Sequence, residues 1–152
     1  MPEFPAVHHG TLLGFDYGER RIGVAVARPA AGSGRPLGTL TRRSREALMT
    51  AVGELIDEWR PDLLVVGLPL SMDGTPHALT EAARRFADRL HGRFGLPVRL
   101  VDERLSSIEA RERLRRARSA GRRRRIRRGE VDALAAVLIL ETFMEQPDEA
   151  HG

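Results

Sequence analysis

Two short apolar runs near the amino terminus, separated by a tight turn, constrain the fold of this chain most strongly. Residues 11–16 read Thr-Leu-Leu-Gly-Phe-Asp and residues 22–27 read Ile-Gly-Val-Ala-Val-Ala. The few residues between them suit an antiparallel hairpin, because parallel strands need a long crossover. Asp16 ends the first strand, although Asp is a poor strand former and is costly to bury without a partner. We therefore interpret Asp16 as the first member of a set of metal-binding acids.

The central part of the chain alternates between helix and strand patterns. Residues 29–35, rich in Gly, Ala and Pro, predict a loop, and residues 37–41 predict a third, edge strand. Apolar residues at helical spacing predict a helix from an N-cap at Ser44 to about Trp59. The continuous apolar run 63–66 is typical of a strand covered on both faces. A second helix is expected to begin with Thr75 as N-cap and Pro76 as first residue, and residues 98–101 form a fifth strand.

The last third of the chain predicts helices separated by a basic loop. Ser106 and Glu109 have the spacing of a capping box and begin a short helix, residues 120–128 form the loop, and residues 131–143 form a final, deeply packed helix. This order predicts an α/β fold with a mixed five-stranded sheet, helices on both faces and strand two antiparallel. Strands one, four and five are expected to be parallel. We expect one domain over residues 1–152, with loose tails at 1–9 and 147–152.

Composition and charge narrow the class of protein. The sequence has no cysteine, no apolar run of membrane-spanning length and no pattern of a signal peptide at its start. We expect a cytoplasmic protein without a membrane partner. All 25 basic residues are arginine, and 13 of them lie from Arg99 to Arg128, although the net charge is only +4. Arginine suits phosphate geometry, and such a cluster is the usual footprint of a nucleic-acid partner.

Two further acids are expected near Asp16. Glu103 follows the fifth strand, and ligands of open α/β sheets collect at the carboxyl ends of strands. Asp132 lies in the first turn of the final helix, a position where the helix dipole also favours a negative charge. Asp102 competes with Glu103, and strand alternation in the sequence does not separate the two. Three such carboxylates suit Mg²⁺ or Mn²⁺, and two ions together can promote phosphodiester cleavage.

Five motifs, in this order, resemble the YqgF/RuvX family over roughly residues 10–146. They are Gly-Thr-Leu-Leu-Gly-Phe-Asp-Tyr-Gly at 10–18, Arg-Ile-Gly-Val-Ala-Val at 21–26, Val-Gly-Leu-Pro-Leu at 66–70 with Met-Asp-Gly-Thr at 72–75, Asp-Glu-Arg-Leu-Ser at 102–106 and Val-Asp-Ala at 131–133. The resemblance implies an RNase H-like fold, similar to that of the Holliday-junction resolvase RuvC. It also implies a nuclease that matures the 5′ end of pre-16S rRNA, and it selects Asp16, Glu103 and Asp132 as the acidic triad, in preference to Asp102.

Two positions depart from the family pattern. Ser71 stands where Asn is usual, a small polar exchange that we expect to be tolerated. Glu130 stands where a basic residue is common, so Arg127 and Arg128 are expected to supply the phosphate contact there. The residues predicted to bind the substrate are Gly18, Arg20, Arg21, Arg104, Arg122, Arg123, Arg124, Arg125, Arg127 and Arg128.

The sequence leaves several functions open. The leading hypothesis is a hydrolase, a metal-dependent ribonuclease acting on precursor rRNA with two Mg²⁺ or Mn²⁺ ions. A resolvase of branched DNA is the first alternative; it requires a two-fold dimer, whereas we expect a monomer or weak homodimer. The second alternative is an RNA-binding ribosome-assembly factor without catalysis. A nucleotide-binding fragment of an actin-like or Hsp70-like ATPase is the least favoured, because such proteins need two such domains.

Overall fold

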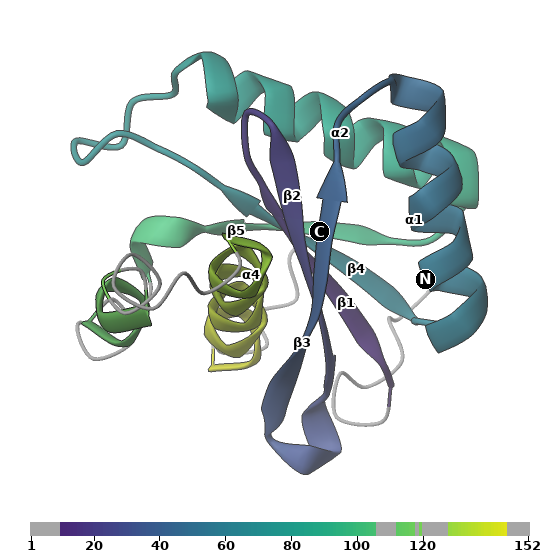
Figure 1. Cartoon of the computed structure of the whole chain (residues 1–152), viewed down its shortest axis with the longest axis horizontal. Helices are drawn as coiled ribbons and strands as arrows, with labels where there is room; N and C mark the ends of the chain where they lie inside the picture. Colours follow the sequence, from purple (N-terminus) through teal and green to yellow (C-terminus); the bar gives the residue numbers. More distant parts are fainter. Residues whose placement is uncertain (1–9, 106–111, 118, 120–127, 146–152) are drawn as a thin grey trace, which may run out of the picture.

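Five strands form one mixed sheet in the computed structural model, which describes residues 10–105, 112–117, 119 and 128–145 (Figure 1). The strands are β1 (Leu12–Tyr17), β2 (Arg21–Arg28), β3 (Ser33–Thr41), β4 (Leu63–Leu68) and β5 (Val98–Asp102). They lie in the order β3-β2-β1-β4-β5. The first hairpin is antiparallel, whereas β1 pairs with β4, and β4 with β5, in parallel. The predicted fold class and strand directions are confirmed.

Helices cover both faces of this sheet. The elements α1 (Arg45–Trp59) and α2 (Ala78–Phe94) pack on one face, and α4 (Arg128–Glu145) packs on the other (Figure 1). Two single turns, η2 (Pro29–Ala31) and η3 (Glu103–Leu105), follow β2 and β5. The predicted N-cap of α1 is confirmed, since the Ser44 hydroxyl accepts a hydrogen bond of 3.0 Å from the Ala47 backbone N–H.

Alternation along the strands divides the core into two layers. On β1, Phe15 and Tyr17 belong to the layer beneath α1 and α2, whereas Leu12 belongs to the layer beneath α4. The Phe86 ring of α2 meets Phe15 edge to face, with 5.7 Å between ring centroids. Every residue of β4 is buried, which explains why its sequence shows a continuous apolar run rather than an alternating one. The apolar middle of α4 is buried as well.

Three predicted boundaries were wrong. The strand β3 begins at Ser33, inside the expected loop, because β2 is eight residues long and offers a paired edge as far as Arg28, the partner of Ser33. The N-cap of α2 is His77, because the Thr75 backbone and hydroxyl instead bond to Asp73 in the preceding turn. The last helix begins at residue 128, inside the expected basic loop.

Other expectations fall on residues that the structure does not describe. These are the tails, the capping box of Ser106 and Glu109, and the basic loop over 120–127. Within the described residues, no helix combines the length and the apolar character needed to cross a bilayer.

Candidate active site

Three glycines on neighbouring strands let α4 lie close against the sheet. Gly14 of β1, Gly23 of β2 and Gly67 of β4 all face this helix. A Cβ atom on Gly14 would come within 2.5 Å of Cγ of Leu140, and one on Gly23 would overlap the backbone of Asp132. A side chain at either position would therefore push the helix away from the sheet.

Asp16 lies near the carboxyl end of β1, on the face that α4 covers. Its neighbours Phe15 and Tyr17 are buried on the opposite face against α2, so alternation turns the Asp16 side chain towards α4. Its cross-strand partner on β2 is Gly23. On the other side of β1, Val66 of β4 pairs with Phe15, and Gly67 is the next residue of β4. Glycine thus flanks Asp16 on both neighbouring strands.

Asp132 lies over Gly23, where the missing side chain allows the two backbones to touch. Its carboxylate forms an ion pair with Arg21, with 3.0 Å between Nε and Oδ2. The same Oδ2 atom is buried and has no hydrogen-bond partner among the described residues. The guanidinium is therefore close enough to offset the charge but is not directed to donate a hydrogen bond.

Glu103 begins η3, directly after β5 ends. Gly67 makes room for its side chain, since a Cβ atom on this glycine would come 2.7 Å from Oε1 of Glu103. Each glycine that flanks Asp16 therefore leaves space for one other predicted acid: Gly23 for the backbone of Asp132, and Gly67 for the carboxylate of Glu103. The structure brings all three acids to one face of the sheet, at the carboxyl ends of β1 and β5.

Asp102 lies on the opposite face of the sheet, and its carboxylate is bound by Arg104. Val101 packs beneath α4, so alternation places the adjacent Asp102 on the α2 side. Arg104 donates four hydrogen bonds to this carboxylate, from its backbone N–H and its guanidinium, at 2.7 to 3.2 Å. Burial acts to raise the pKa of Asp102, but these bonds and the positive charge outweigh it and hold the pKa below the ordinary 3.8. This geometry favours Glu103 over Asp102 as a ligand.

The acids suit a divalent metal in their chemistry, although they are not arranged around one position. Among the described residues, no three His, Asp or Glu side chains form a group that could hold a metal ion. The donor set is nevertheless of the right kind, since carboxylate oxygens are the ligands that Mg²⁺ and Mn²⁺ prefer. The buried Oδ2 of Asp132, which lacks a hydrogen bond, is the atom that a bound cation would satisfy.

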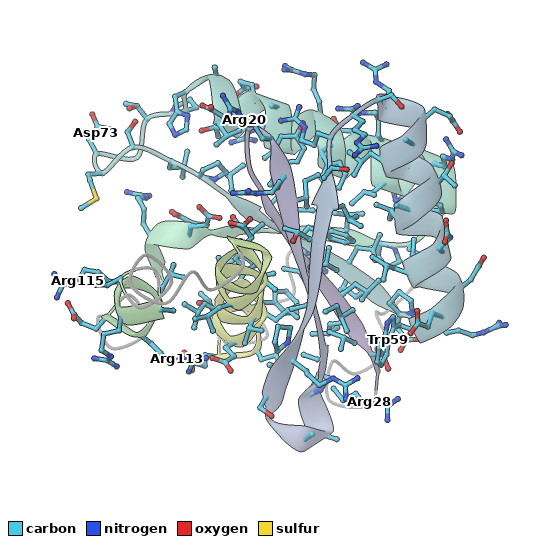
Figure 2. All side chains as sticks on the ribbon, in the orientation of Figure 1. Arg20, Arg28, Trp59, Asp73, Arg113 and Arg115 are labelled. Atoms are coloured by element: carbon cyan, nitrogen blue, oxygen red, sulfur yellow. The ribbon has the colours of Figure 1, made fainter. Side chains whose placement is uncertain are left out.

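The predicted substrate-binding residues have different surroundings. Arg20 is exposed at the tip of the β1–β2 hairpin (Figure 2), whereas Arg21 and Arg104 are paired with acids. Gly18 serves the turn itself, because its N–H donates to the Arg21 carbonyl at 3.0 Å and a Cβ atom would lie 2.7 Å from that oxygen. Arg128 begins α4, and its side chain lies outside the described structure. The remaining predicted arginines, 122–125 and 127, lie outside the described residues.

Two supporting residues were not predicted. Arg42, just after β3, donates from Nη1 to the carbonyls of Gly18 and Glu19 at 2.8 and 2.7 Å, and its guanidinium lies 4.5 Å from the centre of the Tyr17 ring. It thereby fixes the turn that follows Asp16. No local pattern marks Arg42, because its partners lie more than 20 residues earlier in the chain.

The other is Thr80 of α2, which is completely buried. Its hydroxyl donates to the Pro69 carbonyl and accepts from the His77 backbone N–H. It therefore joins the two ends of the loop that follows β4. Figure 2 shows Asp73 at the outer end of this loop. Within the loop, Ser71 contributes backbone bonds to Thr75 and Gly74, which any residue could make, in agreement with a tolerated exchange of Asn for Ser.

A family model described as "RuvX: Holliday junction resolvase" matches residues 10–146. The chain belongs to the RuvX family. It is 52% identical over 142 residues to a protein of Burkholderia ambifaria named "Putative pre-16S rRNA nuclease", and the match covers 93% of each chain. A protein of Paraburkholderia phymatum with the same name is 51% identical over 151 residues, which cover 96% of this chain and 95% of that one. The predicted resemblance is confirmed.

Solved structures support the fold of this RuvX-family chain. Thermus thermophilus RuvC superimposes with a TM-score of 0.52 over 88% of this chain and 94% of that one, at 16% identity. The same resolvase in complex with a Holliday-junction substrate gives a TM-score of 0.51 at 17% identity, over 89% and 94% of the two chains. At such low identity the likeness concerns the fold alone, which is RNase H-like as predicted.

Proposed function

We propose that this RuvX-family protein is a metal-dependent nuclease that processes the 5′ end of pre-16S rRNA in the cytoplasm. The observation that carries the proposal is the placement of Asp16, with glycine on both neighbouring strands and another acid beside each glycine. The names of relatives that match nearly the whole chain support the substrate.

Asp16, Glu103 and Asp132 are the residues that would hold the metal. Bound Mg²⁺ or Mn²⁺ would activate the attacking water and stabilise the leaving oxygen of the phosphodiester. The sheet fixes Asp16, the turn after β5 supplies Glu103, and α4 supplies Asp132. Since the three acids come from separate elements, bringing them onto a metal needs side-chain rotation and a change of partner at Asp132, which is paired with Arg21.

Arginines around this face would hold the phosphate backbone of the substrate. Arg20 is exposed on the hairpin that follows Asp16, and a guanidinium there can reach a phosphate without breaking a bond described in the structure. Arg104, in contrast, already donates to Asp102 and to the Met72 carbonyl, so its contribution is to order the loop after β4. The arginines at 122–125, 127 and 128 remain part of the proposal as further phosphate contacts.

The decisive experiment compares labelled pre-16S rRNA with a four-way DNA junction, each with Mn²⁺ and each with EDTA. Replacing Asp16 with Asn should reduce metal-dependent cleavage about 1,000-fold, equivalent to about 4 kcal/mol, while circular dichroism and the melting temperature stay close to wild type. Asp57→Asn, on the exposed side of α1, is the matched control and should cleave normally. Full activity in the Asp16→Asn protein would refute the proposed site.

A junction resolvase is the second candidate, favoured by the description of the family model and by the likeness to RuvC. Such an enzyme cuts two strands symmetrically and so acts as a two-fold dimer. Preferential cutting of the four-way junction, by a species that sediments as a dimer, would support it over rRNA processing. A protein that binds RNA with a steep salt dependence but cuts neither substrate would instead be an assembly factor.

A further inference from the structure

Arg21 is paired with one of the proposed metal ligands. It is the first residue of β2 and lies on the same face as Gly23, two residues later. Its Nε atom is 3.0 Å from Oδ2 of Asp132, and the two side chains are 36% and 26% exposed. The two side chains are therefore partly open to solvent, although the Oδ2 atom of Asp132 is itself buried.

The contact is loose in comparison with the arginine–aspartate pair on the opposite face of the sheet. Arg104 donates four hydrogen bonds to Asp102, whereas Oδ2 of Asp132 has none from the described residues. Arg21 thus compensates the charge of Asp132 without satisfying its oxygen. Such a pair is held together by charge alone, and a stronger cation can easily replace the guanidinium.

We propose that Arg21 is an internal counter-charge that occupies Asp132 in the metal-free protein and is displaced when the divalent cation binds. The cation and the guanidinium compete for the same oxygen, and two positive groups on one carboxylate repel each other. Once displaced, the guanidinium has lost its ion pair with Asp132. It is then available to a phosphate of the nucleic acid, so that metal binding prepares the substrate contact.

This inference rests on the proposed function, because it uses Asp132 as a metal ligand. It adds that Arg21 opposes metal binding and supports substrate binding only after the metal has arrived. A residue that bound phosphate permanently would instead have the same effect on the substrate with and without metal. The two roles can therefore be separated by measurement.

The first experiment titrates Mn²⁺ into the full chain by calorimetry, without nucleic acid. Arg21→Met keeps an unbranched apolar stem but removes the competing charge, so Mn²⁺ should bind about two- to fivefold more tightly, the range expected for a partly exposed ion pair. Arg20→Met removes the same charge from the adjacent, exposed position and serves as the matched control, with an affinity close to wild type. Equal changes in both variants would show a general charge effect and overturn the inference.

A double variant tests whether the effect passes through Asp132. In an Asp132→Asn background, where the ligand is already lost, adding Arg21→Met should bring no further gain in Mn²⁺ affinity. The same gain as in the wild-type background would mean that Arg21 acts elsewhere and would also overturn the inference. The melting temperatures of all variants in EDTA show whether each protein is folded.

The second experiment measures binding of a labelled RNA, checked on a gel to be intact after the measurement, with EDTA and with Mn²⁺. Arg21→Met should weaken RNA binding severalfold with Mn²⁺ and have little effect with EDTA, whereas Arg20→Met should have the same effect in both. An equal loss for Arg21→Met under both conditions would contradict the displacement.

These results can be distinguished from the fate of the proposed nuclease function. If the wild-type protein cleaves RNA but Arg21→Met binds Mn²⁺ no more tightly, the nuclease stands and the counter-charge is wrong. If no substrate is cleaved but Mn²⁺ binds more tightly to Arg21→Met, the counter-charge stands and the nuclease function is wrong. Absence of Mn²⁺ binding in every variant would refute the inference.

Discussion

Gly23 of β2 and Asp132 of α4 touch through their backbones, with no side chain between them. The contact sets the distance between α4 and the sheet at Asp132, which is a proposed metal ligand. It also places Asp132 next to Asp16, the cross-strand partner of Gly23. Packing of the core and geometry of the site are therefore fixed by the same pair of residues.

Gly23→Ala should destabilise the protein by about 3 kcal/mol, because the new methyl group must displace α4 and overpack the core. Urea unfolding followed by the fluorescence of Trp59, the single tryptophan, measures the change. Gly92 of α2 is the matched control, since a Cβ atom there meets nothing within 4 Å. Gly92→Ala should stabilise by about 0.5–1 kcal/mol. Similar effects of the two substitutions would contradict the close approach of α4.

Glu103→Gln and Asp102→Asn should differ in their effect on cleavage. Glu103 faces Gly67 beneath α4, whereas Asp102 is saturated by Arg104 on the other side. We expect Glu103→Gln to lower metal-dependent cleavage at least 100-fold, or about 3 kcal/mol, and Asp102→Asn to lower it a few-fold at most. Initial rates on labelled precursor RNA test this, and the reverse order would identify Asp102 as the ligand.

Arg42→Ala should loosen the turn that follows Asp16. The substitution removes two hydrogen bonds to backbone carbonyls and the contact with the Tyr17 ring, so a loss of about 1–3 kcal/mol is expected. Arg43→Ala, at the exposed neighbouring position, should change stability by less than about 0.5 kcal/mol. Thermal unfolding of both variants provides the comparison, and equal melting temperatures would show that Arg42 does not hold the turn.

The stabilising effect of Asp102 should depend on pH. A carboxyl group whose pKa is lowered in the folded state stabilises the fold above its unfolded pKa, near 3.8, and loses this effect as pH falls through the folded value. Asp102→Asn should therefore cost about 1 kcal/mol at pH 7, and the difference from wild type should shrink between pH 5 and pH 2. A difference that stays constant over this range would show that the charge of Asp102 contributes nothing.

Local patterns were sufficient for most of the fold. The hairpin of β1 and β2 follows from two apolar runs with a turn too short for a crossover, and buried β4 follows from its unbroken apolar run. One error arose where a residue had two possible local partners. Thr75 resembles an N-cap in sequence, but it bonds to Asp73 instead, and only the tertiary position of the loop decides between these roles.

The sequence could nominate acids for the proposed site but could not predict their geometry. Asp16, Glu103 and Asp132 could be selected as acids at the ends of elements and by family resemblance. The pairing of Arg21 with Asp132 could not, because these residues lie more than 100 positions apart and meet only through the packing of α4. The role of Gly67 could not be predicted either, because this glycine acts by leaving space for the side chain of Glu103.

The position of α4 in the chain has a consequence for synthesis. The five strands, including β1 with Asp16 and β5 just before Glu103, are synthesised first. The helix α4, which carries Asp132 and covers one face of the sheet, is synthesised after all of them. Since chains emerge from the ribosome amino terminus first, a nascent chain has neither the complete set of acids nor a covered sheet until α4 has emerged. The proposed site is therefore assembled last, when α4 packs onto a sheet whose five strands have already been made.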